Sequence, residues 1–513
     1  MIPSNVSPDV AHALPQKPVL HELADPPTLK EFDAALSLMK NGKTPGADLI
    51  TAEMLKAGGS DLSSRLHSLF TAVWLSGHVP KDWRDAIFIP IPKKGDLSVC
   101  DNYRGIALLS IVGKLFAKII LARLDHSLDC QLTESQCGFR QGRSCNDMIF
   151  VARQILEKGR EHQTPTFFTF VDLKKAYDSV NRALCWSVLE KIGVPSNVVG
   201  LIAGLHTGMM ATISVNGCLC EPFEVSSGLR QGCVLAPLLF NLFWNQVVQE
   251  WKKRLGDAVG IRVAYKFSTR LQNPRIKSND GVALVSEGLF ADDMELITST
   301  ADDMVIAVAT LDVVCLEWGL LISTQKTKVM TDGIDDIQVE IRGQKLESVS
   351  NFVYLGSKLS RGNDLGPEVA RRIGLAAAAF GLLRKPLWKK SEIDKETKFQ
   401  VYKAVVLPTL LYGAETWTTK QKDIKKLNTF HLRCLRSIIG VSWKDRWTNA
   451  KVLETCQSHG MPFLVSCARL RWLGHIARLD SDRLPKQLLF GRLSSSRPAG
   501  GPLLRWTDCA KRI

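Results

Sequence analysis

Two adjacent aspartates, Asp292 and Asp293, interrupt an otherwise apolar stretch at residues 289–297, LFADDMELI. Strand-forming residues flank the pair, so both aspartates are predicted at or near the tip of a tight hairpin. Aspartate is common in turns because its side chain bonds the local backbone, which is the ordinary interpretation. Alternatively, two carboxylates on a rigid hairpin suit hard divalent cations such as Mg²⁺, which prefer oxygen ligands.

A second strand that ends in an acid lies upstream, in FFTFVDLKKAYD, where Asp172 follows a largely apolar run. Taken alone, this is an ordinary strand-to-helix junction with an aspartate near a helix start, which the helix dipole favours. Asp292 follows 120 residues later on another predicted strand. A sheet that joined the two strands would bring both carboxylates around a pair of metals about 3.5 to 4 Å apart, as two-metal phosphoryl transfer requires.

Basic residues are concentrated in the last third of the chain. Residues 1–360 contain 37 Lys and Arg against 39 Asp and Glu, whereas residues 361–513 contain 29 against 12. The net charges are therefore −2 and +17, and the second value indicates a polyanionic partner, most commonly nucleic acid. A membrane surface is the weaker alternative, because no strongly basic amphipathic helix with an aromatic apolar face is evident.

The 513 residues are 45% apolar and 23% charged, which is typical of a soluble globular protein of roughly three domains. The sequence has no apolar run of 18 residues and no signal peptide, so an intracellular location, nuclear or cytoplasmic, is expected. The 13 cysteines include no C-x-x-C pair and are predicted to be reduced thiols. Structural zinc is a minor alternative for six residues whose spacing fits no common template: His431, Cys434, Cys456, His459, Cys467 and His475.

Local patterns predict the order of helices and strands. Residues 1–27 are predicted to be a loosely ordered lead-in, and residues 491–502, GRLSSSRPAGGP, a flexible connector. Beyond Pro367 the chain is predicted to be almost wholly helical. Further helices are expected at 28–40, 111–124, 235–255 and 302–318, and strands within 85–94, 165–172 and 326–330, with hairpins at 211–226, around Asp292 and near FVYLG.

Eight motifs occur in the order typical of the reverse transcriptases of non-LTR, LINE-type retrotransposons, which the chain resembles. They are GKTPGADLITAEMLKAGG, DNYRGIALLSIVGK, ESQCGFRQGRSCND, FVDLKKAYD, GLRQGCVLAPLLFNLF, FADDM, WGLLISTQKTKVM and FVYLGSKLS. The resemblance implies an α+β right-hand polymerase. Its expected parts are fingers at 28–165, palm at 166–360, thumb-like helices at 361–440 and a helical basic C-terminal region at 441–513.

The resemblance also implies roles for the residues that match these motifs. Asp172 and Asp292 would ligate two Mg²⁺ ions, or Mn²⁺ in their place, with Asp293 as an accessory acid and the Leu173 carbonyl as a further ligand. Lys326 would be the general acid for pyrophosphate, or else an ordinary exposed strand lysine. These residues form the predicted catalytic and metal site.

The remaining implied roles concern the nucleotide. Tyr177 would exclude a 2′-hydroxyl by steric contact, with a packed core aromatic as the alternative. Gln231 and Gly232 would line the pocket, Gly232 because backbone must approach the ligand closely. Three finger cations, of which Lys93 could equally be solvated surface charge, would bind the triphosphate or template phosphates: Lys93, Arg104 and Arg140.

The implied activity is RNA-directed DNA synthesis from a primer 3′ end, with an RNA template, a DNA primer and deoxynucleoside triphosphates as partners; no oligomeric state is predicted. Only 41 residues precede GKTPGAD, so the family's N-terminal nicking endonuclease is expected to be absent. The alternative function is an inactive retroelement relic that only binds nucleic acid. Two segments interleave Trp with Arg, RLRWLGHIARLD and RWTDCAKRI, which suits either base stacking or core tryptophans with surface arginines.

Overall fold

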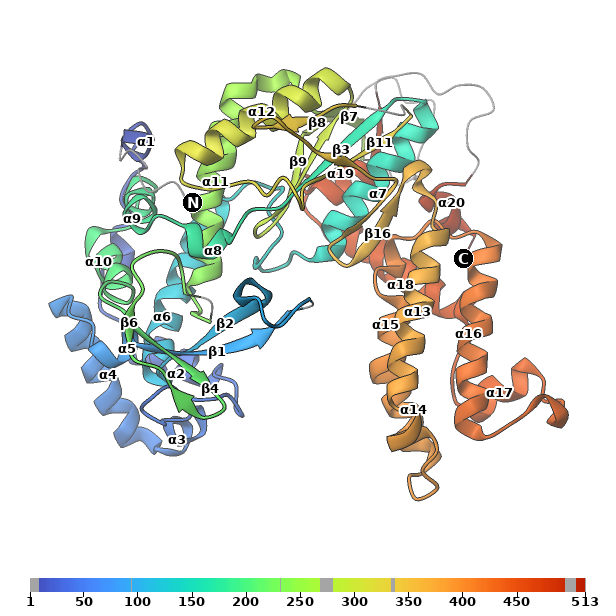
Figure 1. Cartoon of the computed structure of the whole chain (residues 1–513), viewed down its shortest axis with the longest axis horizontal. Coiled ribbons are helices and arrows are strands. Elements are labelled where there is room, and N and C mark those ends of the chain that lie inside the picture. The colour runs from blue at the N-terminus through green and yellow to red at the C-terminus, as the bar shows by residue number, and fades with distance from the viewer. Residues whose placement is uncertain are drawn as a thin grey trace.

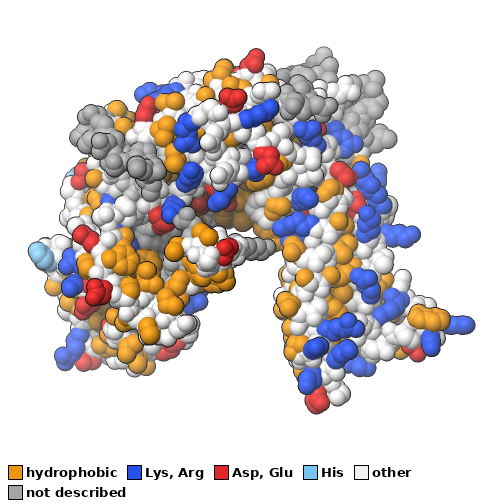
Figure 2. Space-filling view, viewed as in Figure 1, with side chains coloured by type: hydrophobic (Ala, Val, Ile, Leu, Met, Phe, Trp, Pro, Cys, Tyr) orange, Lys and Arg blue, Asp and Glu red, His pale blue; other side chains and the backbone are white. Residues whose placement is uncertain are grey.

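The computed structural model describes residues 9–93, 95–230, 232–267, 280–333, 337–493 and 504–512. Helices and strands are mixed along the chain, as predicted. An N-terminal lobe and an arm of long helices descend on either side of a central sheet (Figure 1). Side chains leave the space between the lobe and the arm open (Figure 2).

The central sheet has the strand order β14-β11-β3-β10-β9. The bounds of these strands are Glu347–Ser348, Lys328–Asp332, Thr166–Val171, Asp293–Thr298 and Glu287–Phe290. Every position of β3 is buried, because its alternate side chains enter two different cores. Phe167 packs in the core that includes Met304 of α12 (Ala301–Glu317), whereas Phe168 packs in the core that includes Met148 of α7 (Cys145–His162).

The N-terminal lobe contains a second sheet, in which β1 (Ala86–Pro92) pairs with β2 (Tyr103–Leu108) and β4 (Met210–Val215). The expected helices at 28–40 and 111–124 are present as α2 (Leu29–Ser37) and α6 (Ile111–Leu128). The predicted helix at 235–255 is α11 (Ala236–Leu255).

The lead-in predicted to be loosely ordered is packed over its described part, residues 9–27, so that prediction is wrong there. Lys17 and Leu20 donate backbone hydrogen bonds to the carbonyls of Lys191 and Gly193, at 2.9 and 2.8 Å. Leu23 is buried. These partners lie at and beyond the end of α9 (Arg182–Lys191), so long-range pairing supplies the order that the local sequence does not encode.

The helical arm comprises α13 (Gly366–Leu382), α14 (Lys395–Val401), α15 (Leu407–Leu411), α16 (Gln421–Ile439) and α17 (Asn449–Thr455). It has its own core around Tyr402, Trp417 and Leu435. Pro367 occupies the first turn of α13, as predicted. There its missing N–H has no intrahelical partner to lose.

The chain then returns from the arm to α7 through α18 (Met461–Arg478), α19 (Leu484–Phe490) and α20 (Trp506–Lys511). The expected connector at 491–502 begins instead with a strand, β17 (Gly491–Leu493), which pairs with β7 (Ile261–Tyr265). Residues 494–502 of that connector lie outside the described residues. The start of the connector is therefore part of the fold.

Trp472 and Trp506, the tryptophans of the two Arg/Trp segments, are 7% and 0% exposed. Both pack edge-on against Phe150 of α7, with ring centroids 5.7 and 5.3 Å away. They are core residues, so the base-stacking interpretation is wrong for both rings.

Three of the six residues of the zinc alternative are buried, namely His431, Cys434 and Cys456. His431 hydrogen bonds through its ring nitrogens with the Tyr402 hydroxyl at 2.8 Å and the His459 carbonyl at 3.1 Å. Cys434 and Cys456 are buried thiols. In the described part of the chain no helix is both long and apolar enough to cross a membrane.

Candidate active site

Strand register brings the predicted aspartates together. β3 and β10 are antiparallel neighbours in which Val171 lies opposite Met294. Asp172 is the residue after Val171, and Asp292 and Asp293 immediately precede Met294. The end of β3 and the β9–β10 turn therefore meet at one edge of the central sheet, close enough for the three carboxylates to influence one another electrostatically.

Gln136 clamps the turn that carries the aspartate pair. Its Oε1 accepts hydrogen bonds from the backbone N–H groups of Ala291 and Gly138, both at 2.9 Å, and its Nε2 donates to the Ala291 carbonyl at 3.3 Å. Ala291 has a φ of 57°, a left-handed conformation that non-glycine residues rarely adopt. An added Cβ at Gly138 would lie 2.2 Å from the Ala291 nitrogen, so glycine is required for this close approach.

The three carboxylates repel one another. Partial burial, then the neighbouring Asp292 and Asp172, raise the pKa of Asp293 to about 6. Burial, with a smaller contribution from Asp172, raises the pKa of Asp292, and nearby Arg104 opposes that rise. A cation bound between these groups would relieve this crowding, which is the electrostatic property of a metal site.

Lys326 lies beside Asp172. Its Nζ is 3.5 Å from Asp172 Oδ2, and its side chain is 73% exposed. Ser323 forms the turn that places it there, because its N–H donates to the Asp172 carbonyl at 2.8 Å and its carbonyl accepts from Lys326 at 3.2 Å. Thr327 Oγ1 also accepts from the Asp172 N–H, at 3.2 Å. Lys326 is thus the cation poised at the carboxylates in this structure.

Leu173 and Tyr177 lie on the segment that follows Asp172. Leu173 forms an antiparallel bridge with Ile322, whose two hydrogen bonds use the backbone of the neighbouring residues, so the Leu173 carbonyl takes no part in that bridge. Tyr177 is half-buried and stacks on Phe240 of α11, with centroids 4.6 Å apart. Burial and then nearby Asp292 raise the pKa of its hydroxyl, so the ring borders the carboxylates.

Strand β2 of the lobe sheet brings Arg104 close to this edge, and Lys93 lies at the end of the neighbouring strand β1. Arg104 is exposed and close enough to Asp292 to lower that residue's pKa. Lys93 follows β1, where its N–H donates to the Asn102 carbonyl at 2.6 Å, and the β1–β2 register would place it on the same face as Arg104. Gly232 has a φ of +115°, and an added Cβ would lie 2.7 Å from the Ala107 carbonyl, so glycine allows this segment to approach β2.

Arg140 does not join the site. Its side chain is 3% exposed, and its guanidinium pairs with both Asp129 carboxylate oxygens, at 2.7 and 3.0 Å, and with the Thr133 and Gln136 carbonyls. This geometry argues against the predicted nucleotide-binding role and assigns Arg140 to the support of the Gln136 segment. Gln231 lies outside the described residues.

The donor set suits divalent cations. Carboxylate and carbonyl oxygens are the ligands that Mg²⁺ prefers, and Asp172 Oδ2 is a buried oxygen that has no hydrogen-bond partner apart from its ion pair with Lys326. Among the described residues, however, no three acidic, His or Cys side chains are already drawn together around a common point. We conclude that the residue types fit and that the side chains would have to converge on a bound cation.

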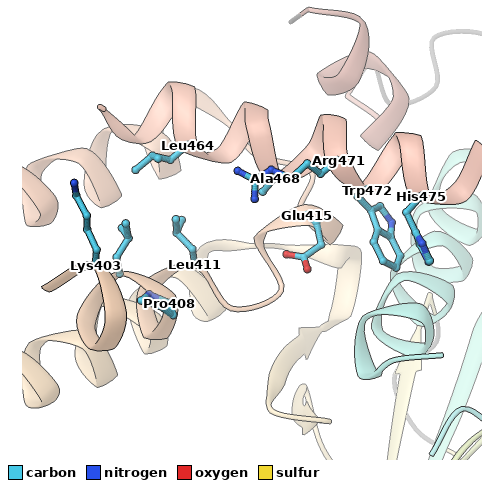
Figure 3. Close-up of a pocket in the computed structure, with 10 residues that line it drawn as sticks. Lys403, Pro408, Leu411, Glu415, Leu464, Ala468, Arg471, Trp472 and His475 are labelled. Carbon is cyan, nitrogen blue, oxygen red and sulfur yellow. The ribbon is translucent and has the colours of Figure 1, made fainter. Parts of the chain in front are cut away.

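A cavity of about 530 Å³ lies elsewhere, between α15 and α18 (Figure 3). Leu411, Leu464 and Trp472 supply apolar walls, and Glu415 and Arg471 point into it from opposite sides. Burial raises the pKa of Glu415, which accepts a hydrogen bond from Asn146 of α7. The cavity marks the joint between the arm and α7 and is not part of the carboxylate site.

Residues 91–359 match the family "Reverse transcriptase (RNA-dependent DNA polymerase)". This match covers more than half of the chain, and it includes the central sheet with the carboxylates at its edge. The chain belongs to the reverse transcriptase family.

Similar proteins come from transposons. The chain is 28% identical over 367 residues to the "Transposon TX1 uncharacterized 149 kDa protein" of Xenopus laevis, covering 70% of this chain and 27% of that protein. It is 25% identical over 451 residues to the "Probable RNA-directed DNA polymerase from transposon BS" of Drosophila melanogaster, covering 85% of this chain and 46% of that protein. The chain therefore spans less than half the length of either relative.

A solved structure of apo telomerase from Candida tropicalis, truncated from its C-terminal domain, has a TM-score of 0.39 and 12% identity to this chain. The comparison covers 63% of this chain and 62% of that one.

Proposed function

We propose that the chain is an RNA-directed DNA polymerase that extends a primer 3′ end on an RNA template by two-metal phosphoryl transfer. The observation that carries the proposal is the β3–β10 register, because it brings Asp172 next to the aspartate pair from a strand more than a hundred residues away. In this assignment the central sheet is the palm, the N-terminal lobe supplies the fingers, and the helical arm is the thumb.

Each residue of the site would have a distinct role in the reaction. Asp172, Asp292 and the Leu173 carbonyl would hold two Mg²⁺ ions, which when bound stabilise the charge on the attacking and leaving oxygens. Lys326 would exchange its Asp172 contact for the triphosphate and hold a proton near the leaving pyrophosphate. Arg104 would neutralise the triphosphate from the fingers side. Tyr177 would lie against the sugar and exclude a 2′-hydroxyl.

Primer extension on homopolymer RNA tests the proposal. Asp172→Asn and Asp292→Asn each keep the side-chain shape but remove a charged metal ligand, so extension should fall below detection while RNA binding changes little. Asp302→Asn, an exposed aspartate in the first turn of α12, is the matched control and should extend normally.

Chelation of divalent cations should stop the wild-type reaction, and Mg²⁺ or Mn²⁺ should restore it. Extension by either active-site variant at the wild-type rate would refute the two-metal assignment. Wild-type protein that binds RNA but never extends a primer would instead favour the inactive nucleic-acid-binding alternative.

A further inference from the structure

One tryptophan is almost fully exposed on the helical arm. Trp443 is 85% exposed and begins the short helix η9 (Trp443–Asp445), which connects α16 to α17. An apolar ring of this size is normally buried or in contact with a partner. The exposed ring is therefore a candidate contact for a binding partner.

The loop that presents Trp443 is held in place. The Ser442 N–H and hydroxyl both donate to the Asp445 carboxylate, at 2.7 and 2.8 Å. On the far side of the loop, Arg436 donates to Asn449 Oδ1 at 2.8 Å and to the Trp447 carbonyl at 3.3 Å. The ring is thus presented by a pre-organised loop, which reduces the entropy lost on binding.

Exposed basic residues lie along α16 and in the loop that carries Trp443. Four exposed basic residues of α16 follow a spacing of three, four or seven positions and so lie on one face of the helix: Lys422, Lys425, Lys426 and Arg433. Exposed Lys444 and Arg446 follow Trp443 in the same loop. We call these six cations and Trp443 the outer strip. Residues 422–446 contain two acidic side chains, buried Asp423 and exposed Asp445, so the six cations leave the outer strip net positive.

The outer strip faces away from the carboxylate site. The loop between α16 and α17 projects from the far end of the arm, on the side opposite the N-terminal lobe (Figure 1). Blue side chains follow this outer edge of the arm, and an orange patch with blue neighbours forms the projecting tip (Figure 2). A strand bound here would not occupy the space between the lobe and the arm.

We propose that the outer strip binds single-stranded nucleic acid at a second contact, separate from the active-site groove. The α16 cations would track the phosphates, and Trp443 would stack on one base, which is the combination found at single-strand sites. A duplex would match the cations but would offer the ring no unstacked base. Binding at the outer strip does not depend on catalysis, so it can be tested separately from the proposed polymerase activity.

Equilibrium binding by fluorescence anisotropy tests the proposal, with the full chain, no Mg²⁺ and no nucleotides. The probes are labelled single strands of RNA and of DNA and a duplex of equal length. Trp443→Ala should weaken single-strand binding about fivefold or more, since stacking contributes about 1 to 3 kcal/mol per base. Trp443→Phe should retain most of the affinity, and the duplex should be little affected. The two single-strand arms show whether RNA or DNA is preferred.

A second variant tests the contribution of the α16 cations to binding. Lys425→Gln with Lys426→Gln should flatten the slope of log affinity against log salt by about 1.4, at about 0.7 per phosphate contact on a single strand. The same double charge loss on the N-terminal lobe, Lys30→Gln with Arg65→Gln, is the control and should leave the slope unchanged.

The proposal is overturned if the single-strand affinity of Trp443→Ala equals that of wild type, if duplex and single strands lose affinity equally, or if Trp443→Ala changes its oligomeric state in ultracentrifugation with binding intact. Primer extension at saturating template should be normal in Trp443→Ala. If it fails although Asp302→Asn is active, Trp443 acts in the polymerase groove and the outer assignment is wrong.

Discussion

At the scale of the residue, Tyr177 gives the sharpest test of specificity. Its ring is fixed by stacking on Phe240, so it presents a rigid surface beside Asp292. Tyr177→Ala should lower discrimination against ribonucleotides by about 10- to 100-fold, the range expected for a small steric difference. Tyr177→Phe keeps the ring and should keep the discrimination. The measurement is the ratio of ribonucleotide to deoxyribonucleotide incorporation. An unchanged ratio in Tyr177→Ala would make Tyr177 a packing residue only.

At the scale of the element, the β9–β10 hairpin depends on the segment that clamps it. Gln136→Ala removes three hydrogen bonds to Ala291 and Gly138, so the turn should shift and the carboxylates with it. We expect kcat for primer extension to fall about 10- to 100-fold with little change in KM.

The control for this experiment is Gln154→Ala, a buried glutamine of α7 that bonds Glu157 and not the hairpin. It should lose stability but keep kcat per folded molecule. If both variants lose kcat equally, Gln136 contributes only to stability and does not position the hairpin.

At the scale of the whole molecule, the last third of the chain contributes to the stability of the fold as well as to its positive charge. Trp506 is fully buried, and it donates from its ring to the Glu415 carbonyl at 2.8 Å and from its backbone to Glu157 at 2.9 Å. Trp506→Ala should therefore cost about 3 to 5 kcal/mol of unfolding free energy. The same change at exposed Trp443 should cost less than about 0.5 kcal/mol. Denaturant unfolding of both variants measures this, and equal costs would contradict the burial assigned to Trp506.

The charge of the whole molecule gives a separate prediction. Residues 361–513 carry the entire positive excess, so primer–template binding should be strongly salt-dependent. With about five phosphate contacts, log affinity should fall against log salt with a slope near −4 to −5. A slope near zero, measured by a salt titration of wild-type binding, would mean that this charge serves another partner.

The sequence by itself determined the features that depend on neighbours along the chain. Apolar runs located β3 and α11, Pro367 located the start of α13, and the charge count located the basic third. The two acidic positions were also evident, because a carboxylate at the end of an apolar strand is a local pattern. The expectation that Asp172 and Asp292 would meet rested on a shared sheet, and β3 and β10 are neighbours in that sheet.

Only the tertiary structure decided which side chains are free to act. Arg104 and Arg140 both lie in motifs that match the family. Arg104 is near Asp292, whereas Arg140 is buried in an ion pair with Asp129. Trp472 and Trp506 have arginine neighbours in sequence but pack on Phe150, whereas Trp443 is exposed. Burial and hydrogen bonding are set by segments that are distant in sequence, so no local pattern can distinguish these cases.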